Sequence, residues 1–425
     1  MYLGIDFGTS GCRAVVINEH KEIIAEVKQA LAPPDHQCGR IQQNASVWIQ
    51  GLDSLFQQLA TKLDLTQLKR LAIDGTSATV IICNKQGKPL LPALMYNDSS
   101  SFSAAQLIKQ HCPSSQHITM SLSSGLPKAL QLCEDFDILD DIIILNQADY
   151  LSNYLCGQWG VSDYHNALKL GYDVEKMQWP EWISQLLPEH VLPEVIQPGQ
   201  VIEEITEQLS LKYGLSRDCL ICAGSTDANA AFIATESTRS GDAVTSIGTT
   251  LVLKILNDKP VEELASGVYS HKLGNNWLVG GGSNAGAGIL RQFFSDQQIA
   301  DLSKQIDLNQ STGLDYYPLS HTGERFPYND PQKQPILEPR PESDVKFLQA
   351  LLEGLSRIEK TGYEKLHQLG ALKPQHIKTC GGGAQNPQWT AMRQQLLKIP
   401  VKAASQTEAS YGSALLALQG LKNYQ

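Results

Sequence analysis

The chain has 425 residues, of which 42% are hydrophobic and 18% are charged, with 33 glycines and 20 prolines. This composition is typical of a folded α/β protein and excludes a disordered or fibrous chain. At about 150 residues per domain, two large domains fit the length best. The formal net charge of -10 argues against nucleic-acid and anionic-membrane partners, because both would repel an acidic surface.

The nine cysteines are scattered without the spacing of a disulfide framework, and the first residues, MYLGID, lack the charged start of a secretory signal. Cys219 and Cys222 form one C-x-x-C pair in a segment that alternates like a buried strand, which favours core packing over a metal or redox site. No apolar run reaches the roughly 18 residues of a membrane span. We therefore expect a cytoplasmic protein with reduced thiols.

The first predicted elements form a β-meander, since the segment YLGIDFGTSGCRAVVINEHKEIIAEV at 2–27 has β-branched residues on either side of its glycines. RLAIDGTSATVIICN at 70–84 predicts a strand broken by a Gly-Thr-Ser turn. Strands and helices alternate from there to about residue 225, which predicts a sheet covered by helices. Between these strands, Ser46 is the candidate N-cap of a helix with apolar side chains at helical spacing, namely Trp48, Leu52, Leu55, Phe56, Leu59 and Leu63.

The second half of the chain repeats the design of the first. DAVTSIGTTLVLKIL at 242–256 predicts a strand, a turn of glycine and hydroxyl residues, and a second strand. Within it, IGTTLVLKI echoes DFGTSGCRAVVI at 6–17. An echo over so long an interval indicates two domains of similar design.

The last predicted elements lead to a further Gly-rich turn. A long helix is predicted at 344–369 and ends at Gly370, because its leucines recur on one face. The strand HIKTC at 376–380 then runs into GGGAQN. Asn386 and Pro387 are a suitable cap and first residue for one more helix.

Three predicted strand ends each deliver glycine together with hydroxyl or amide residues. Glycine lets the backbone adopt positive φ angles and approach an anion, and the exposed N–H groups of such turns bind phosphate oxygens. A single Gly-rich turn usually only reverses the chain, but three of them predict a nucleotide held between two domains. The three turns are Gly8-Thr9-Ser10-Gly11, Gly248-Thr249-Thr250, and Gly381-Gly382-Gly383 with Asn386.

Carboxylates lie at the ends of two predicted strands, Asp6 before the first turn and Asp227 in AGSTDANAAF. Phosphoryl transfer to an alcohol needs a base for the hydroxyl proton and anionic ligands that place Mg²⁺ against the phosphates, and these two acids can supply both. The competing interpretation is structural, because an aspartate near glycine is often a turn former, and Asp227 could cap the helix ANAAFIA. His165 is isolated among polar residues, which favours a hydrogen-bonded structural role.

Other nucleotide and hydrolase motifs are missing from the sequence. There is no GxxxxGK[ST] segment, and no GxGxxG follows a predicted strand, so a Walker-type or Rossmann site is unsupported. The segment GGSNA at 281–285 departs from the GxSxG motif of serine hydrolases at its final residue.

Seven short segments carry a resemblance to a known family. They are DFGTSGCRAVV at 6–16, SDYHNALKLGYD at 162–173, GSTDANAAF at 224–232, SIGTT at 246–250, TGERFP at 322–327, LEGL at 352–355 and GGGAQN at 381–386. In this order they resemble the motifs of the FGGY family of carbohydrate kinases, over almost the whole chain. The sequence is most similar to the short D-ribulose kinase-like branch, whose plant and cyanobacterial members were first described as xylulose kinase homologues.

The resemblance implies two ribonuclease-H-like α/β domains of the actin and hexokinase superfamily, closing around a nucleotide cleft. The N-terminal domain would span 1–234, together with a returning helix at 408–425, and would hold the sugar and the phosphate. The C-terminal domain would span 235–407 and hold the nucleotide. ATP and Mg²⁺ are the implied cofactors, and a small sugar is the implied substrate.

The resemblance also implies roles for single residues. Asp227 would be the catalytic base, Asp6 would help to place Mg²⁺ and the sugar, and Thr9 would meet the transferred phosphate. Asp227 would share the metal and sugar sites with Asp6. The implied nucleotide contacts are Thr9, Ser10, Gly248, Thr249, Thr250, Gly382, Gly383 and Asn386.

Two segments depart from the longer relatives at the sugar. Asp74-Gly75-Thr76-Ser77 stands where xylulose kinases usually carry Gln-Met-His-Gly, and YNDSS at 96–100 stands where they carry Trp-x-Asp-x-Arg. A serine-lined pocket suits a polyol chain, so Ser77 is a candidate substrate contact, with an ordinary turn hydroxyl as the alternative. We expect ATP-dependent phosphorylation of a ketopentose at its terminal hydroxyl, with D-ribulose as the first candidate and D-xylulose or another polyol as the alternative.

Two further classes share such a nucleotide cleft. A chaperone-like or filament-forming ATPase uses nucleotide to drive a partner-binding switch, and a non-catalytic sensor only binds it. Only about 40 residues follow the third Gly-rich turn, which is too few for an added substrate-binding domain. The intact Asp6, Thr9 and Asp227 argue against a non-catalytic protein. Both observations favour a kinase.

Overall fold

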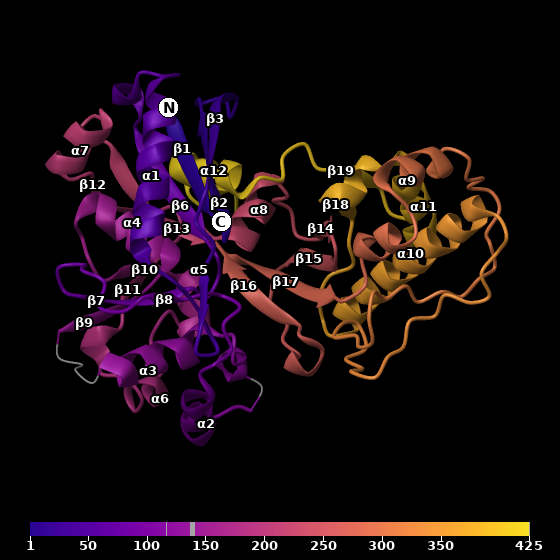
Figure 1. Ribbon diagram of the computed structural model, residues 1–425, viewed down its shortest axis with the longest axis horizontal. Helices are drawn as coiled ribbons and strands as arrows, with labels where there is room; N and C mark the ends of the chain where they lie inside the picture. Colours follow the sequence, from indigo (N-terminus) through magenta and orange to yellow (C-terminus); the bar gives the residue numbers. More distant parts are fainter. Residues whose placement is uncertain (116, 137–140, 425) are drawn as a thin grey trace. The chain divides into compact units, whose positions relative to one another are not determined.

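The computed structural model describes the whole chain except residues 116, 137–140 and 425 (Figure 1). Gln425, the last residue of the predicted returning segment, thus lies outside the described residues. The chain divides into two compact units, each with a sheet of its own. Unit 1 comprises Met1–Ala234 and Glu408–Lys422, and unit 2 comprises Thr235–Thr407 and Asn423–Gln425.

The core of unit 1 is a six-stranded sheet. Its strands are β1 (Tyr2–Phe7), β2 (Gly11–Ile17), β3 (Ile23–Ala30), β6 (Arg70–Gly75), β12 (Val201–Glu204) and β13 (Leu220–Thr226). The order is β12-β13-β6-β1-β2-β3, in which β1, β2 and β3 form the predicted antiparallel meander. β6 lies parallel to both β1 and β13, so these three strands end at the same edge of the sheet.

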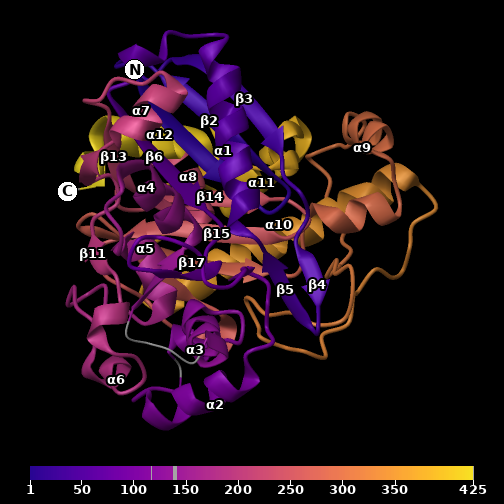
Figure 2. The ribbon, with the colours of Figure 1, turned by 60° about the vertical axis from the view of Figure 1, so that its left-hand side comes forward.

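One face of this sheet is covered by α1 (Ala45–Ala60) and α4 (Gln147–Cys156) (Figure 2). A Cβ atom on Gly51 of α1 would lie 3.4 Å from the Phe7 ring, and one on Gly75 would lie 3.0 Å from Oε1 of Gln147 in α4. Phe7 and Gly75 are paired on neighbouring strands and therefore project from the same face of the sheet. Since α1 packs on Phe7 and α4 packs on Gly75, both helices cover this face.

The opposite face is covered by α12 (Ala409–Gln419), which comes from the end of the chain. A Cβ atom on Gly4 of β1 would lie 2.0 Å from the carbonyl oxygen of Ser410, so only glycine permits this approach of strand and helix. α8 (Asp227–Ala234) crosses α12 equally closely, since a Cβ atom on Gly412 would lie 1.9 Å from the carbonyl oxygen of Ala230.

The predicted N-cap of the first helix is wrong. Asn44 is the cap: its backbone is extended, with φ -75 and ψ 134, and its side-chain oxygen accepts a hydrogen bond from the Ser46 N–H at 3.0 Å. Ser46 already lies in the first turn, where its own N–H needs a partner. The helix also ends at Ala60, before Leu63.

The remainder of unit 1 contains a second sheet, a small parallel pair and short helices. The second sheet has the order β4-β5-β8-β7-β9, and β10 pairs with β11. These strands are β4 (Asp35–Gln37), β5 (Arg40–Gln43), β7 (Val80–Asn84), β8 (Ala93–Leu94), β9 (Ile142–Asn146), β10 (Val161–Asp163) and β11 (Glu194–Ile196). The helices are α2 (Phe102–His111), α3 (Gly125–Phe136), α5 (Tyr164–Ala167), α6 (Glu181–Ser184) and α7 (Glu207–Tyr213).

Unit 2 is built on a six-stranded sheet with the order β16-β17-β15-β14-β18-β19. Its strands are β14 (Asp242–Ile247), β15 (Leu251–Asn257), β16 (Tyr269–Leu273), β17 (Asn276–Ser283), β18 (His376–Cys380) and β19 (Val401–Ala403). The antiparallel hairpin of β14 and β15 is followed on the other side of β14 by the parallel strand β18, as β6 follows β1 in unit 1. The echo in the sequence thus corresponds to a repeated strand arrangement.

The helices of unit 2 are α9 (Asp296–Ser303), α10 (Asp344–Gln368) and α11 (Pro387–Leu397). The predicted long helix is confirmed as α10, with Leu369 as its C-cap, and the last predicted helix is confirmed as α11, capped by Asn386.

A buried ion pair joins α10 to α11. Arg393 donates from Nε and Nη2 to the two carboxylate oxygens of Glu359, both at 2.6 Å, and from Nη1 to the Thr379 hydroxyl at 2.7 Å. The Thr245 hydroxyl donates to Oε1 of Glu359 at 2.6 Å. Arg393 and Glu359 are each 1% exposed, so this network ties the sheet of unit 2 to both helices without water.

Candidate active site

Three carboxylates lie at one edge of the unit 1 sheet, where its parallel strands end. Asp6 on β1 and Asp74 on β6 are paired in register, and their side chains face α12. Asp227 directly follows β13, whose Thr226 pairs with Gly75. The structure therefore brings together the two aspartates that the sequence singled out, and adds Asp74 between them.

Burial and mutual repulsion control the charge of this cluster. The pKa of Asp6 is raised to about 6, mainly by burial and also by the nearby charge of Asp227, although a hydrogen-bonding contribution from Asp74 opposes the shift. Asp74 is fully buried, so its pKa is raised well above the usual range, with the charge of Asp6 as the next cause. The Ser413 hydroxyl of α12 donates to Oδ2 of Asp74 at 2.6 Å.

Asp227 is more accessible than Asp74. It is the first residue of α8, and its Oδ1 accepts a hydrogen bond from the Ala228 N–H at 2.6 Å. Its side chain is partly exposed, in contrast to the fully buried Asp74. This contact to the adjacent residue is not the predicted cap, because Asp227 is itself the first residue of α8.

The first Gly-rich turn joins β1 to β2 and places Thr9 and Ser10 at this same edge. The Gly8 N–H donates to the Gly11 carbonyl at 3.0 Å, and Ser10 is exposed. Gly8 and Gly11 were predicted to adopt positive φ angles, but neither does. Close packing is the reason for glycine instead, since a Cβ atom on Gly11 would lie 3.1 Å from the carbonyl oxygen of Gln29.

Ser77 lies two residues after β6, in the turn that leads to β7. Its side chain is half-buried, and among the described residues its hydroxyl has no hydrogen-bond partner. The next residue, Ala78, has a φ of 66°, which is unusual for a residue other than glycine. Ser77 is therefore free to contact a ligand at the end of β6.

The two Gly-rich turns of unit 2 lie side by side at the ends of the parallel strands β14 and β18. A Cβ atom on Gly381 would lie 2.6 Å from the Ile247 carbonyl oxygen and 3.4 Å from the Gly248 nitrogen. Gly381 has a φ of 79°, so the predicted positive φ occurs here. Thr249 and Thr250 complete the neighbouring turn between β14 and β15.

The remaining predicted nucleotide contacts follow Gly381. Gly382 is exposed with open space around its Cα, whereas Gly383 is buried against Ile247. The Asn386 side chain accepts from the Trp389 N–H at 3.0 Å and donates to the Ser303 hydroxyl at 2.8 Å. Its side-chain oxygen thus caps α11, and its side-chain nitrogen is engaged with Ser303.

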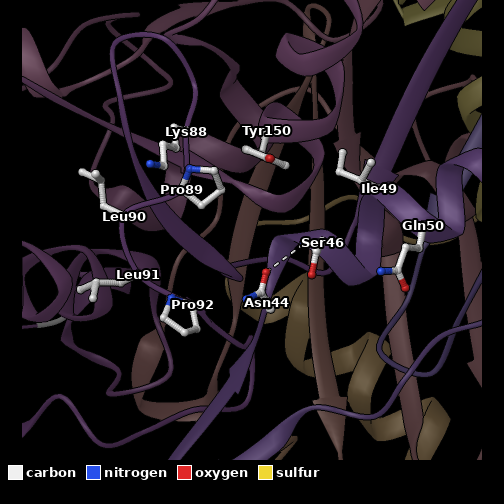
Figure 3. Close-up of a pocket in the computed structure, with 10 residues that line it drawn as sticks. All are labelled: Asn44, Ser46, Ile49, Gln50, Lys88, Pro89, Leu90, Leu91, Pro92 and Tyr150. Atoms are coloured by element: carbon white, nitrogen blue, oxygen red, sulfur yellow. Dashed lines mark hydrogen bonds between the residues drawn. The ribbon is translucent and has the colours of Figure 1, made fainter. Parts of the chain in front are cut away.

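Two of the hollows in the described parts of the chain have volumes above 500 Å³. One, of about 520 Å³, adjoins the third Gly-rich turn and is lined by Ala384, Gln385, Pro387, Thr390, Ala391, Gln394 and Ala403. The other, of about 560 Å³, lies in unit 1 between the start of α1 and the segment 88–92, with Tyr150 reaching it from α4 (Figure 3). Only the first is next to residues with predicted roles.

Sequence reasoning missed Asp74 and Ser413 as members of the acidic cluster. A signal for Asp74 was present, because LGIDFG at 3–8 and LAIDGT at 71–76 are closely similar strand ends. Two parallel neighbours with the same pattern bring their aspartates into register. Ser413 had no such signal, because it meets Asp74 only through the return of α12 to unit 1.

Comparison with known proteins identifies the class. The model of the FGGY carbohydrate kinase N-terminal domain matches residues 1–234, and that of the C-terminal domain matches residues 243–421. The chain therefore belongs to the FGGY family of carbohydrate kinases. It is an ATP-dependent sugar kinase, and the predicted two-domain α/β fold is confirmed.

Individual relatives are distant. The chain is 24% identical to the xylulose kinase of Escherichia coli (strain K12) over 409 residues, covering 92% of this chain and 84% of that protein. It is 25% identical to the xylulose kinase of Haemophilus influenzae over 453 residues, covering 98% and 90%. These relatives are xylulose kinases, so the resemblance to the D-ribulose kinase-like branch stays a prediction.

Two crystal structures share the fold over the whole chain. A xylulose kinase from Brucella ovis has a TM-score of 0.87 at 22% identity, covering 100% of this chain and 91% of that one. Plasmodium falciparum glycerol kinase with ADP has a TM-score of 0.85 at 18% identity, covering 100% and 90%. Along the described residues, every helix is too short or too polar to cross a membrane.

Proposed function

We propose that this kinase transfers the γ-phosphoryl group of ATP to the terminal hydroxyl of a free ketopentose, with D-ribulose as its substrate. The observation that carries the proposal is that Ser77, with an unpaired hydroxyl, follows β6, which lies between the strands that end next to Asp6 and Asp227. A hydroxyl next to two acids suits a polyol acceptor, because a sugar chain both donates and accepts hydrogen bonds.

In this proposal Asp227 is the base. It accepts the proton of the sugar hydroxyl while that oxygen bonds to the γ-phosphorus, and the bond from phosphorus to the β,γ-bridging oxygen breaks. ADP leaves with the bridging oxygen, and the sugar leaves as its phosphate ester. Asp227 suits this role because it is partly exposed at the edge of the sheet, whereas Asp74 is fully buried.

Asp6 and Asp227 would hold Mg²⁺. Mg²⁺ commonly binds one or two carboxylates and takes its other ligands from water and phosphate, and two acids on neighbouring strand ends fit that demand. In the described residues no group of three or more histidine, cysteine, aspartate or glutamate side chains forms a metal cluster, which agrees with a site that depends on phosphate. When bound, the ion neutralises charge on the phosphates.

The phosphate chain of ATP would meet the Gly-rich turns. Thr9 would contact the transferred phosphate, and Gly382 would lie along the adenosine, where its open surroundings leave room for a ligand. The other proposed nucleotide contacts are Ser10, Gly248, Thr249, Thr250, Gly383 and Asn386. For Asn386 the contact would come from its backbone, because both polar groups of its side chain are engaged.

D-Xylulose is the second candidate substrate, because the named relatives are xylulose kinases. ADP release by the purified protein with D-ribulose, D-xylulose, L-ribulose, D-fructose and glycerol separates the two. The highest kcat/KM is expected with D-ribulose. A higher value with D-xylulose assigns the second candidate, and the absence of a sugar-dependent rate with every compound defeats the proposal.

A further inference from the structure

Lys128 is a fully buried lysine whose ammonium group contacts only neutral acceptors. It lies in α3, and its Nζ donates to three backbone carbonyl oxygens: those of Ala78 at 2.9 Å, Tyr96 at 2.9 Å and Ser123 at 3.0 Å. An ammonium group has three protons, so its donor capacity is fully used. Burial lowers the pKa of Lys128 to about 7, which reflects the cost of removing this group from water.

The three carbonyls belong to three separate loops. Ala78 follows Ser77 in the turn after β6, Tyr96 begins the segment 96–100, and Ser123 lies two residues before the buried start of α3. The Ser77 turn and the segment 96–100 are the two places where the sequence departs from the pattern of xylulose kinases. The Lys128 side chain thus connects both of these segments to α3.

A second contact holds the same two loops together. The Tyr96 N–H donates to the Thr79 hydroxyl oxygen at 3.0 Å, and the Thr79 and Thr76 hydroxyls are 2.6 Å apart. Thr76 also donates its N–H to Oε1 of Gln147 in α4 at 3.1 Å. The turn around Ser77 is therefore fixed on both sides, by threonines on one and by Lys128 on the other.

The backbone at this turn is strained. Ala78 has a φ of 66°, a left-handed conformation that costs a residue with a Cβ atom about 1 kcal/mol. Such strain persists only where surrounding contacts impose it, and the carbonyl of Ala78 is one of the three that Lys128 holds. The lysine thus acts on the residue next to Ser77.

We propose that Lys128 is a positioning residue for sugar recognition, which fixes the Ser77 turn against the segment 96–100 in the geometry that the acceptor sugar requires. The inference rests on the proposed function, in which Ser77 contacts the sugar. Tyr96 is 42% exposed and Asn97 is exposed, so the segment offers polar side chains to a ligand. Lys128 itself touches neither the sugar nor ATP.

The first test compares Lys128→Met with Lys62→Met in the full-length protein. Lys62 is a matched control, because its Nζ donates to a single carbonyl, that of Glu26, at 2.8 Å on the surface. With the best sugar of the panel, Lys128→Met is expected to raise the sugar KM at least tenfold and the ATP KM less than twofold. Lys62→Met should change neither constant by as much as twofold. An unchanged sugar KM, or an equal rise in both constants, in Lys128→Met overturns the proposal.

A rescue experiment uses the strained residue. Ala78→Gly lets the turn adopt its left-handed conformation without help, so adding it to Lys128→Met should recover at least part of the sugar KM. If Lys128→Met does not fold, Lys128→Arg takes its place, since a planar guanidinium keeps the charge but does not reach three converging carbonyls. Loss of the fold in both variants assigns Lys128 to the core and overturns the proposal.

Hydrogen–deuterium exchange tests the contact without any sugar. Peptides covering 76–80 and 94–100 should exchange faster in Lys128→Met than in the native chain, while peptides of unit 2 should not change. Unchanged exchange in both segments overturns the proposal. A native protein without sugar-dependent turnover defeats the proposed function instead, so the two failures are distinguishable.

Discussion

Asp6 and Asp74 occupy paired positions on the parallel strands β1 and β6, and the charge of Asp6 raises the pKa of Asp74. Two ionised carboxylates in these positions would repel each other, so one of the two holds a proton. Oδ1 of Asp74 receives no hydrogen bond from an N–H or hydroxyl group in the described residues, and Asp74 is the more deeply buried acid. At neutral pH the proton therefore lies on Asp74, and Asp6 is ionised.

This arrangement predicts an unusual dependence of stability on pH. A carboxyl group whose pKa is raised in the folded state binds more protons there than in the unfolded chain, so stability falls as the pH rises above the unfolded value, near 4. Both Asp6 and Asp74 have raised pKa values. Their contribution to the free energy of unfolding is therefore most unfavourable above about pH 6, where Asp6 is ionised.

Asp74→Asn should relieve this cost, because a buried amide is neutral at every pH and does not repel the Asp6 carboxylate. We expect the variant to be more stable than the native chain at pH 8 by about 1 to 3 kcal/mol, and by less at pH 5. Urea unfolding in EDTA at both pH values measures the difference in the free energy of unfolding between the variant and the native chain. Asp315→Asn is the control, because the Asp315 side chain is 100% exposed. This variant should be as stable as the native chain at both pH values. Equal stability of Asp74→Asn and native protein at pH 8 would contradict the assigned proton.

The acidic cluster shows how far the sequence predicts the site. The meander, the long helix α10 and the repeated Gly-rich turns follow from local patterns of apolar residues and glycine. The sequence did not predict Asp74 as a member of this cluster, because an aspartate before glycine has the pattern of a turn former. The strand that pairs with it, β1, is also far away in the chain. Ser413 depends on the path of α12, which no local pattern determines.

Helix and turn details were predicted less well, for a related reason. The first helix begins at Ala45, with Asn44 as its cap. Asn44 and Ser46 are both residue types that favour the cap position, so the sequence alone does not decide between them. The backbone angles of the folded chain do. Glycine was assigned to positive φ in all three turns, but Gly8 and Gly11 are instead accommodated by close packing. A sequence shows that glycine is needed without showing which of its two properties is used.

Asp227 has two functions in the proposal, and a pair of variants separates them. Asp227→Asn keeps an oxygen that can accept from the Ala228 N–H, whereas Asp227→Ala removes both this contact and the base. We expect both variants to lose about 10²- to 10⁴-fold in kcat, with little change in ATP binding. Only Asp227→Ala should also unfold more easily, by about 1 kcal/mol, because it removes the hydrogen bond from the Ala228 N–H. Steady-state kinetics, ATP titration and urea unfolding provide these values; an active Asp227→Asn would show that Asp227 is not the base.

Gly382 and Gly383 offer a matched pair in the third Gly-rich turn. A Cβ atom on Gly383 would lie 2.5 Å from a side-chain carbon of Ile247, whereas one on Gly382 meets nothing within 4 Å. Gly383→Ala should therefore lower the melting temperature by several degrees, at a cost of about 1 to 3 kcal/mol. Gly382→Ala should melt like the native chain without ligand, and raise the ATP KM if adenosine lies there. An unchanged ATP KM in Gly382→Ala would remove this residue from the nucleotide site.

The buried pair of Arg393 and Glu359 should dominate the stability of unit 2. Arg393→Met leaves the Glu359 carboxylate with hydroxyl partners only, so we expect a loss of about 3 to 5 kcal/mol in urea unfolding. Arg217→Ala is the control, because its pair with Glu207 is exposed, and it should cost less than about 1 kcal/mol.

The double variant Arg393→Met with Glu359→Gln decides what this loss represents. If the cost comes from an uncompensated buried charge, replacing the carboxylate by a neutral amide should restore much of the stability, because the amide still accepts from the Thr245 hydroxyl. If it comes from lost packing between α10 and α11, the second substitution should restore nothing. A double variant no more stable than Arg393→Met would therefore favour packing, and would show that the ion pair contributes geometry more than charge compensation.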